Sequence, residues 1–105
     1  MKQTFLELRH LRTLLALKET GSVSMAAKRV YLTQSALSHQ IKLMEEQFGL
    51  PLFERKSNPL RFTAAGDRLI RLANEILPKV VDAERELARV KHGDAGQLRI
   101  AVECH

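Results

Sequence analysis

The residues best suited to chemistry lie in segment 32–49, LTQSALSHQIKLMEEQFG. Its first dozen residues include several small polar side chains and one cation, Lys42, but no acid. Carboxylates appear only at Glu45 and Glu46, although the dipole of a helix favours acids at its N-terminus. We interpret the acid-free half as the part of a helix that approaches a polyanion.

The same segment separates into two faces when it is read as a helix capped by Thr33 and ended by Gly49. Apolar residues at helical spacing form a face that is predicted to be buried: Leu37, Ile41, Met44 and Phe48. The opposite face is polar and free to contact a partner; it carries Ser35, His39, Lys42 and Glu46, with Ser38 at its margin.

Two shorter helices are predicted before this segment. The first runs from about residue 7 to 20 and ends at Gly21. The second, SMAAKRV, is capped by Ser22 or Ser24, and Tyr31 and Leu32 form the turn that follows it. A short helix, a tight turn and a second helix with a polar outer face make a helix-turn-helix.

The segment after Pro51, LFERKSNPLRFT, alternates like a strand, turns at KSNP and returns. It predicts a short basic hairpin, a wing, that carries Arg55, Lys56 and Arg61. The fold class is therefore mainly α: a winged helix-turn-helix with a short β-hairpin wing and a long C-terminal dimerisation helix.

A long helix capped by Thr63 completes the fold. Its apolar residues repeat in 4-3 steps, as in a coiled-coil seam: Leu69, Ala73, Ile76, Val80, Ala83, Leu87 and Val90. We expect this seam to pair with the same helix of a second chain; packing against its own domain is the alternative. Pro78 predicts a kink in the helix.

Composition favours an acidic partner, nucleic acid first and an anionic membrane second. The 17 Lys and Arg exceed the 12 Asp and Glu, which gives a net charge of +5 and a pI of about 9.8. No signal peptide or membrane-spanning run is apparent, so a cytoplasmic protein is expected. No catalytic motif or metal-ligand spacing appears, which predicts that the chain is not an enzyme and binds no metal.

The polar residues imply distinct contacts with DNA. Hydroxyls such as those of Thr33, Ser35 and Ser38 suit phosphate oxygens, whereas Gln34 and His39 suit base edges. An ordinary solvated helix face, and a hairpin charged against edge pairing, are the alternatives. A further alternative is a protein-interaction module that docks an acidic protein through its coiled coil and wing.

The end of the chain changes character. HGDAGQ, residues 92–97, reads as a linker, and LRIAVECH begins as a strand without a partner. We expect truncation within a following domain. The predicted divisions are a winged helix-turn-helix DNA-binding domain at 1–62, a linker and dimerisation helix at 63–92, and a hinge with the first strand of an effector-binding domain at 93–105.

The order of residues from Gly21-Ser22 through Thr33-Gln34-Ser35 and Ser38-His39-Gln40-Ile41 to Thr63-Ala64-Ala65-Gly66 closely resembles the N-terminal signature of LysR-type transcriptional regulators. SALSHQ, ERKSNPLRFT and RIAVECH resemble the methionine-biosynthesis branch of that family most. The resemblance covers about residues 6–92.

The resemblance implies a bacterial, dimeric DNA-binding regulator that is commonly tetrameric at full length and acts on RNA polymerase. It implies no cofactor in this fragment and a small-molecule co-effector, homocysteine in that branch, in the missing domain. Ser35 and His39 depart from the proline and arginine common in the family. The predicted DNA-binding residues are Ser22, Ser24, Thr33, Gln34, Ser35, Ser38, His39, Lys42, Arg55, Lys56, Asn58, Pro59 and Arg61.

Overall fold

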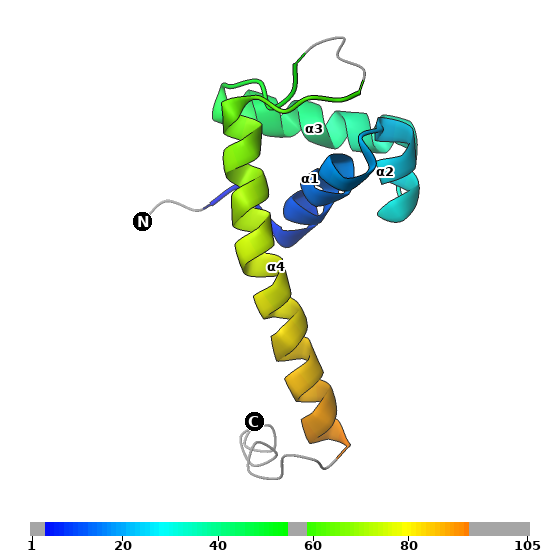
Figure 1. Ribbon diagram of the computed structural model, residues 1–105, viewed down its shortest axis with the longest axis vertical. Helices are drawn as coiled ribbons and strands as arrows, with labels where there is room; N and C mark the ends of the chain where they lie inside the picture. The colour runs from blue at the N-terminus through cyan, green and yellow to red at the C-terminus, as the bar shows by residue number, and fades with distance from the viewer. Residues whose placement is uncertain (1–3, 55–58, 93–105) are drawn as a thin grey trace. The chain divides into compact units, whose positions relative to one another are not determined.

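The computed structural model describes residues 4–54 and 59–92 (Figure 1). Its elements, in order, are α1 (Leu8–Thr20), α2 (Val23–Arg29), α3 (Gln34–Phe48) and α4 (Ala64–Lys91). The chain divides into two compact units, Met1–Glu75 and Ile76–His105. The predicted mainly α fold is confirmed. None of the helices in the described residues is long and apolar enough to cross a membrane.

The helix boundaries follow from residues that cap the ends. Gly21 and Gly49 end α1 and α3 in the left-handed region, at φ 70° and 69°. Ser22 Oγ accepts a hydrogen bond from the Met25 amide (3.2 Å), and Thr33 Oγ1 accepts one from the Ala36 amide (3.0 Å). Ser22, rather than Ser24, is therefore the cap of α2.

The turn between α2 and α3 places a tyrosine where glycine is usual. The Tyr31 and Leu32 amides donate to the carbonyls of Lys28 (3.3 Å) and Ala27 (2.9 Å), the pattern of a Schellman motif. Tyr31 takes the left-handed position of that motif, at φ 61°. A Cβ in this conformation costs roughly 1 kcal/mol relative to glycine.

Side chains from α1, α2 and α3 share one core cluster. Leu17 of α1, Ala26 of α2 and Leu37 of α3 are all fully buried in it. Because the Ala26 side chain is small, the backbone of α2 can approach its neighbours closely. Burying a leucine side chain fully contributes about 1.5–3 kcal/mol, so this cluster fixes the three helices together.

A second cluster joins α1 and α3 to the start of α4. Leu14, Met44, Leu52 and Ile70 form it, each no more than 5% exposed. Phe48 differs from the prediction: it is 39% exposed, and its ring meets the edge of Phe5 at 5.9 Å. It lies at the last turn of α3, where less of the chain is available to cover it.

The predicted wing is described only at its base. Phe53 and Phe62 form an antiparallel bridge, and the Glu54 amide donates to the Arg61 carbonyl (2.9 Å). The centres of the two phenylalanine rings lie 4.6 Å apart, and Lys18 Nζ lies 5.7 Å from the centre of the Phe62 ring. Within residues 4–54 and 59–92 no strand longer than this bridge forms, so the β-hairpin is not shown.

The apolar stripe of α4 is buried in the chain's own core at its start and is partly exposed farther along the helix. Ala73 is fully buried, and Leu69 packs against the second cluster, so this part of the stripe lies in the chain's own core. Packing within the domain, the alternative to a seam, holds for these two residues. Of the remaining predicted seam, Ile76 and Val80 are partly buried, Ala83 and Leu87 are exposed, and Val90 is buried.

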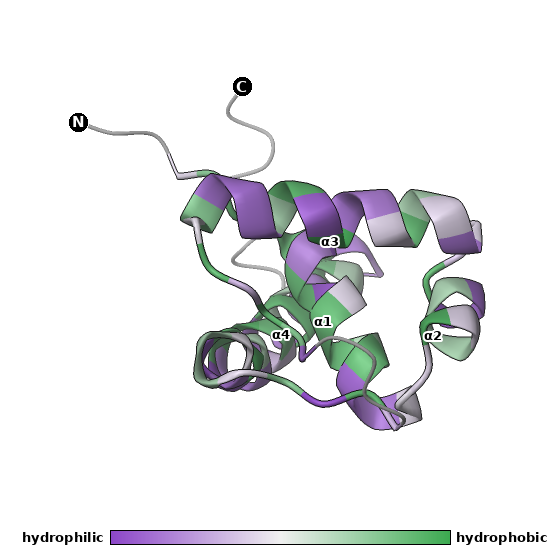
Figure 2. Cartoon of the chain, turned by 90° about the horizontal axis from the view of Figure 1, so that it is seen from above, coloured by the Kyte–Doolittle hydropathy of each residue, from purple (hydrophilic) through white to green (hydrophobic). Residues whose placement is uncertain are grey.

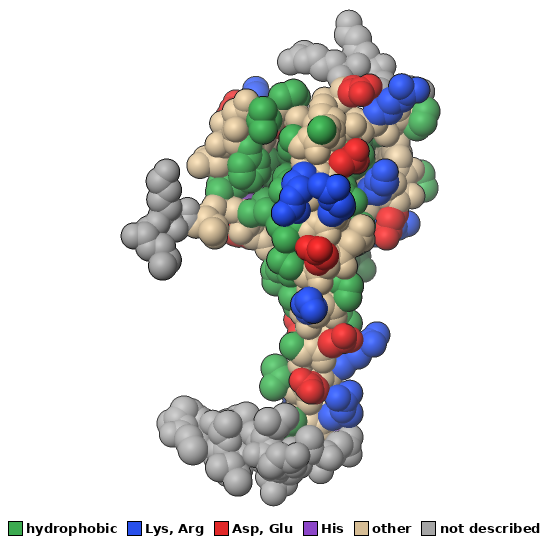
Figure 3. Space-filling model, turned by 60° about the vertical axis from the view of Figure 1, so that its left-hand side comes forward, with side chains coloured by type: hydrophobic (Ala, Val, Ile, Leu, Met, Phe, Trp, Pro, Cys, Tyr) green, Lys and Arg blue, Asp and Glu red, His purple; other side chains and the backbone are tan. Residues whose placement is uncertain are grey.

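Pro78 lies inside α4. Because it lacks an amide proton, it cannot donate to the Asn74 carbonyl as a helical residue would. The expected kink there stays a prediction. Figure 3 shows basic and acidic side chains along the exposed side of this helix.

His10 is a buried histidine that organises the start of α1. It is 3% exposed, stacks on Phe5 at 4.9 Å, and its Nδ1 accepts a hydrogen bond from the Glu7 amide (2.9 Å). Burial first, and Arg9 second, lower the pKa of His10 below its ordinary value, while Glu7 acts in the opposite direction. The neutral ring is therefore the form that the fold requires.

We predict that Gly66→Ala destabilises the fold by about 1–3 kcal/mol, the usual cost of overpacking. A Cβ at this position would collide with the Leu52 carbonyl oxygen and lie 2.8 Å from Phe62 Cδ2. Urea unfolding measures the change. Within a helix, replacing glycine by alanine ordinarily raises the free energy of unfolding, by at most about 1 kcal/mol. A gain in stability for Gly66→Ala would therefore contradict the close approach.

We predict that stability falls as the pH drops below about 6.5, the ordinary pKa of histidine. The pKa of His10 is lower in the folded chain than in the unfolded chain, so on acidification the unfolded chain takes up the proton at a higher pH. Stability therefore falls between these two pKa values and stops falling once the pH is below the folded one. Urea midpoints at several pH values measure it. His10→Asn keeps an acceptor without the titration, so its midpoint should change less; an equal change in both proteins would exclude His10 as the cause.

Candidate nucleic-acid interface

The polar face of α3 is exposed as a continuous surface. Leu37 and Met44 are fully buried on the opposite side and fix the rotation of the helix. Figure 2 shows hydrophilic residues along the outer side of α3. The α3 residues that are predicted to contact DNA are all exposed: Gln34, Ser35, Ser38, His39 and Lys42.

The two capping hydroxyls have a second hydrogen-bonding group available. Ser22 and Thr33 each use their oxygen to accept a backbone amide proton. A hydroxyl that accepts one hydrogen bond still carries a proton that it can donate. Both side chains can therefore cap a helix and donate to a phosphate oxygen at once. Ser24 lies exposed in the first turn of α2.

A hollow brings α2, α3 and the base of the wing together. It is lined by Val23, Ser38, Glu54 and Leu60, among others. Ser38 thus lies on α3 next to the start of α2 and to the segment that leads into the wing. The polar face of α3 and the wing base are parts of one surface rather than separate sites.

The wing residues are described only in part. Pro59 and Arg61 are exposed. Arg55, Lys56 and Asn58 lie outside the described residues, so their predicted roles stay predictions.

Glu45 has a structural role that the sequence interpretation missed. Its Oε2 accepts a hydrogen bond from the Leu52 amide at 2.7 Å. The carboxylate thereby holds the segment after α3 against that helix, near the buried Leu52 side chain. The position of this acid late in α3 is therefore explained by the fold. The available signal was that α3 ends at Gly49, so that the amide of a residue soon after it, Leu52, needs an acceptor from outside the helix ladder.

No group of three potential metal ligands occurs among the residues that the structure describes. His10 is used in the core, and His39 stands on the exposed face of α3. The polar face of α3 offers hydrogen-bond donors, acceptors and one cation, Lys42. It suits the major groove of a duplex, which admits an α-helix.

Comparison with known proteins agrees with this geometry. The family model of bacterial regulatory helix-turn-helix proteins of the LysR family matches residues 8–67. The transcriptional regulator MetR of Haemophilus influenzae is 90% identical over 105 residues, all of this chain and 34% of that protein. MetR of Escherichia coli K12 is 47% identical over 100 residues, 95% of this chain and 31% of that protein.

Solved structures show the same fold. The BenM DNA-binding domain in complex with catB site 1 DNA has a TM-score of 0.77 at 34% identity, covering 86% of this chain and 97% of that one. The CbnR domain in a DNA complex has a TM-score of 0.65 at 32% identity, covering 80% of this chain and 100% of that one.

The chain spans about a third of the length of the MetR relatives. Those relatives are transcriptional regulators, in agreement with the prediction that the chain is not an enzyme. The resemblance seen in the sequence is also confirmed, because the family model matches more than half of the chain. The chain belongs to the LysR family of bacterial regulatory helix-turn-helix proteins.

Proposed function

We propose that the chain is the DNA-binding part of a LysR-type transcriptional regulator that reads an interrupted palindrome as a dimer. The exposed, acid-free half of α3, held in place by buried Leu37 and Met44, is the observation that carries this proposal. The BenM and CbnR domains that share the fold are complexes with DNA, which supports it.

The proposed contacts divide into base reading and phosphate binding. Gln34 suits the bidentate edge of adenine, and His39 can donate to a guanine acceptor. Hydroxyls of Thr33, Ser35 and Ser38, near the positive end of the α3 dipole, suit phosphate oxygens. We propose the remaining candidates as further contacts with DNA: Ser22, Ser24 and Lys42 on the helices, and Arg55, Lys56, Asn58, Pro59 and Arg61 in the predicted wing.

Dimerisation is proposed to use the exposed part of the α4 stripe. Leu87 is 59% exposed and Val81 42% exposed, so both apolar side chains lack cover within the described chain. A second α4 would bury them in the heptad pattern. Two-fold symmetry then requires two half-sites related by the same symmetry, which is why a palindrome is expected.

Methionine biosynthesis is the pathway that we propose. The 90% identity to Haemophilus influenzae MetR supports it over another LysR-type pathway. The proposal extends to homocysteine as a co-effector of a domain beyond this fragment, to a tetramer at full length, to action on RNA polymerase and to a cytoplasmic location. The domain divisions at 1–62, 63–92 and 93–105 belong to the same proposal.

Selection from a randomised duplex pool at two salt concentrations tests base reading. An interrupted palindrome should be enriched and should stay preferred at higher salt, because base contacts depend less on salt than phosphate contacts. His39→Ala should relax preference at a defined base pair, by about 1–3 kcal/mol. Arg61→Ala should weaken binding to all sequences alike and flatten its salt dependence.

Equal losses on the enriched site and on random duplex for both substitutions would contradict the assigned roles. Absence of any enriched sequence, with affinity that collapses as salt rises, would contradict base reading itself.

Leu87→Asp should shift the chain from dimer to monomer, since a carboxylate replaces an apolar side chain of the proposed seam. Sedimentation equilibrium measures the dissociation constant. Arg89→Asp places a carboxylate on the opposite side of α4, about 160° around the helix from Leu87, and should leave the dimer intact. A dimer that withstands Leu87→Asp as well as Arg89→Asp would exclude this part of α4 as the interface.

A further inference from the structure

The later part of α4 carries opposite charges along both edges of its apolar stripe. Lys79 and Glu86 lie on one edge, within about 20° of each other around the helix at about 100° per residue. Glu84 and Lys91 lie in the same way on the other edge. In coiled coils, the charges beside the apolar seam set which helices pair and in which orientation.

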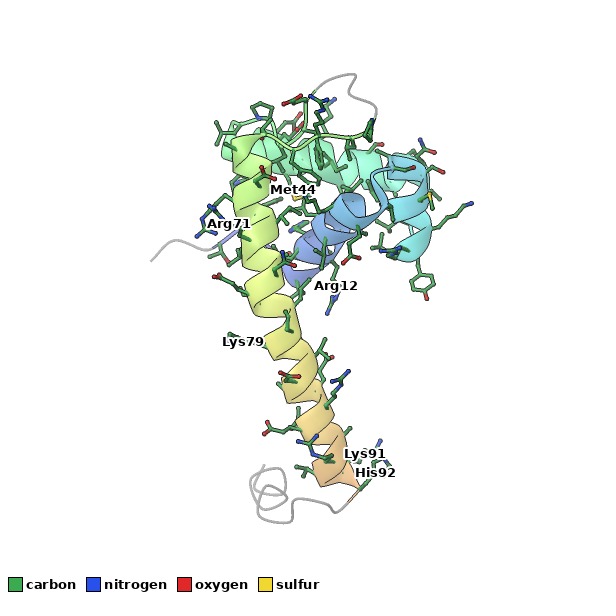
Figure 4. All side chains as sticks on the ribbon, in the orientation of Figure 1. Arg12, Met44, Arg71, Lys79, Lys91 and His92 are labelled. Atoms are coloured by element: carbon green, nitrogen blue, oxygen red, sulfur yellow. The ribbon has the colours of Figure 1, made fainter. Side chains whose placement is uncertain are left out.

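These four charges are not used within the described part of the chain. All four side chains are exposed, and none of them forms a hydrogen bond or an ion pair with any residue that the structure describes. Lys79 and Lys91 extend outward from α4 (Figure 4). The charges are therefore available to a second helix.

The apolar residues between the two edges favour an antiparallel partner. In an antiparallel pair centred between Val80 and Ala83, Val80 faces Ala83 of the second copy, and Ile76 faces its Leu87. Each layer of that seam is filled. In a parallel pair, Ala83 would face its own copy, and two methyl groups would leave a gap that close-packed protein interiors do not contain.

The charges select one register of the antiparallel pair. The edge with Lys79 then faces the same edge of the second copy, where Glu86 lies about 3 Å away along the helix axis. Two-fold symmetry repeats the contact. Sliding one helix by one heptad brings either Lys79 opposite Lys79 or Glu86 opposite Glu86. Of these three registers, only the first joins opposite charges.

We propose that Lys79 pairs with Glu86 of a second copy, twice in each dimer, and that these pairs make α4 selective for its own copy in this register. The inference rests on the proposed function, whose dimer it deepens. Selectivity comes from repulsion as well as attraction, because a helix with another charge pattern places like charges at the same contacts. Exposed ion pairs add little affinity, which suits partner selection better than holding the dimer together.

A parallel pair would use the same charges differently. The edge with Lys79 would face the other edge of the second copy, so Lys79 would meet Glu84, and Glu86 would meet Lys91. The two arrangements therefore require different compensating substitutions, and a charge-reversal experiment separates them.

The first test measures the dissociation constant of the full-chain dimer by sedimentation equilibrium. Lys79→Glu should raise it about tenfold, because two attractive contacts become repulsive. Adding Glu86→Lys to the same chain reverses both charges and should restore the dimer, which excludes misfolding as the cause of the loss. Arg85→Glu makes the matched charge reversal on the exposed side of α4 opposite the stripe and should leave the dimer unchanged.

The second test mixes Lys79→Glu chains with Glu86→Lys chains, one of them labelled with heavy nitrogen, and counts the dimers by native mass spectrometry. A mixed dimer has opposite charges at both contacts, whereas each parent dimer has like charges at both. If each parent is weakened about tenfold, about nine dimers in ten should be mixed, against about half for chains without a preference.

The remaining outcomes overturn the inference in distinguishable ways. If Glu84→Lys, and not Glu86→Lys, restores Lys79→Glu, the helices pair in parallel and the proposed contact is wrong. If Lys79→Glu dimerises as tightly as Arg85→Glu, or mixed dimers stay near half, the charges do not select the partner, while a dimer that Leu87→Asp still breaks leaves the proposed function standing. If Leu87→Asp does not break the dimer, the proposed interface fails, and this inference with it.

Discussion

The fold depends on burying one side of α3 so completely that the other side is left free. Leu37 and Met44 are fully buried in two different core clusters, one with Leu17 and the other with Leu14. Two anchors on one helix, about two turns apart, fix its rotation about its own axis. Every property of the polar face follows from that rotation, because a change in it would turn serine and histidine side chains toward the core.

The ends of α3 are fixed by equally local means, and these connect it to the rest of the site. Thr33 caps the start and keeps a hydroxyl proton for another acceptor, while Glu45 near the end accepts the amide of Leu52. The segment that leads to the wing is thus tied to the same helix that carries the proposed reading residues. Such coupling keeps side chains from two elements in one register, as a binding surface requires.

The helix ends and the buried side of α3 could be predicted from the sequence, because they depend on residues within one or two turns of each other. Thr33, Gly21 and Gly49 mark helix ends through bonds within one turn, and the apolar spacing of Leu37, Ile41 and Met44 gives the buried side. Phe48 was predicted wrongly, since spacing says which side a residue occupies but not whether other chain segments reach it. The role of Glu45 was missed for a related reason: its partner, Leu52, lies beyond the helix.

The sequence by itself determined the order of the helices, their caps, the acid-free polar face and the membership in a family, since each is written in neighbouring residues or in their order. Only the tertiary structure decided that Leu69 and Ala73 belong to the chain's own core and that Gly66 must stay small. It also decided that Tyr31 lines one hollow with arginines of α1 and α2. These depend on contacts between residues far apart in the chain, and no local pattern encodes which surfaces will meet when the helices pack.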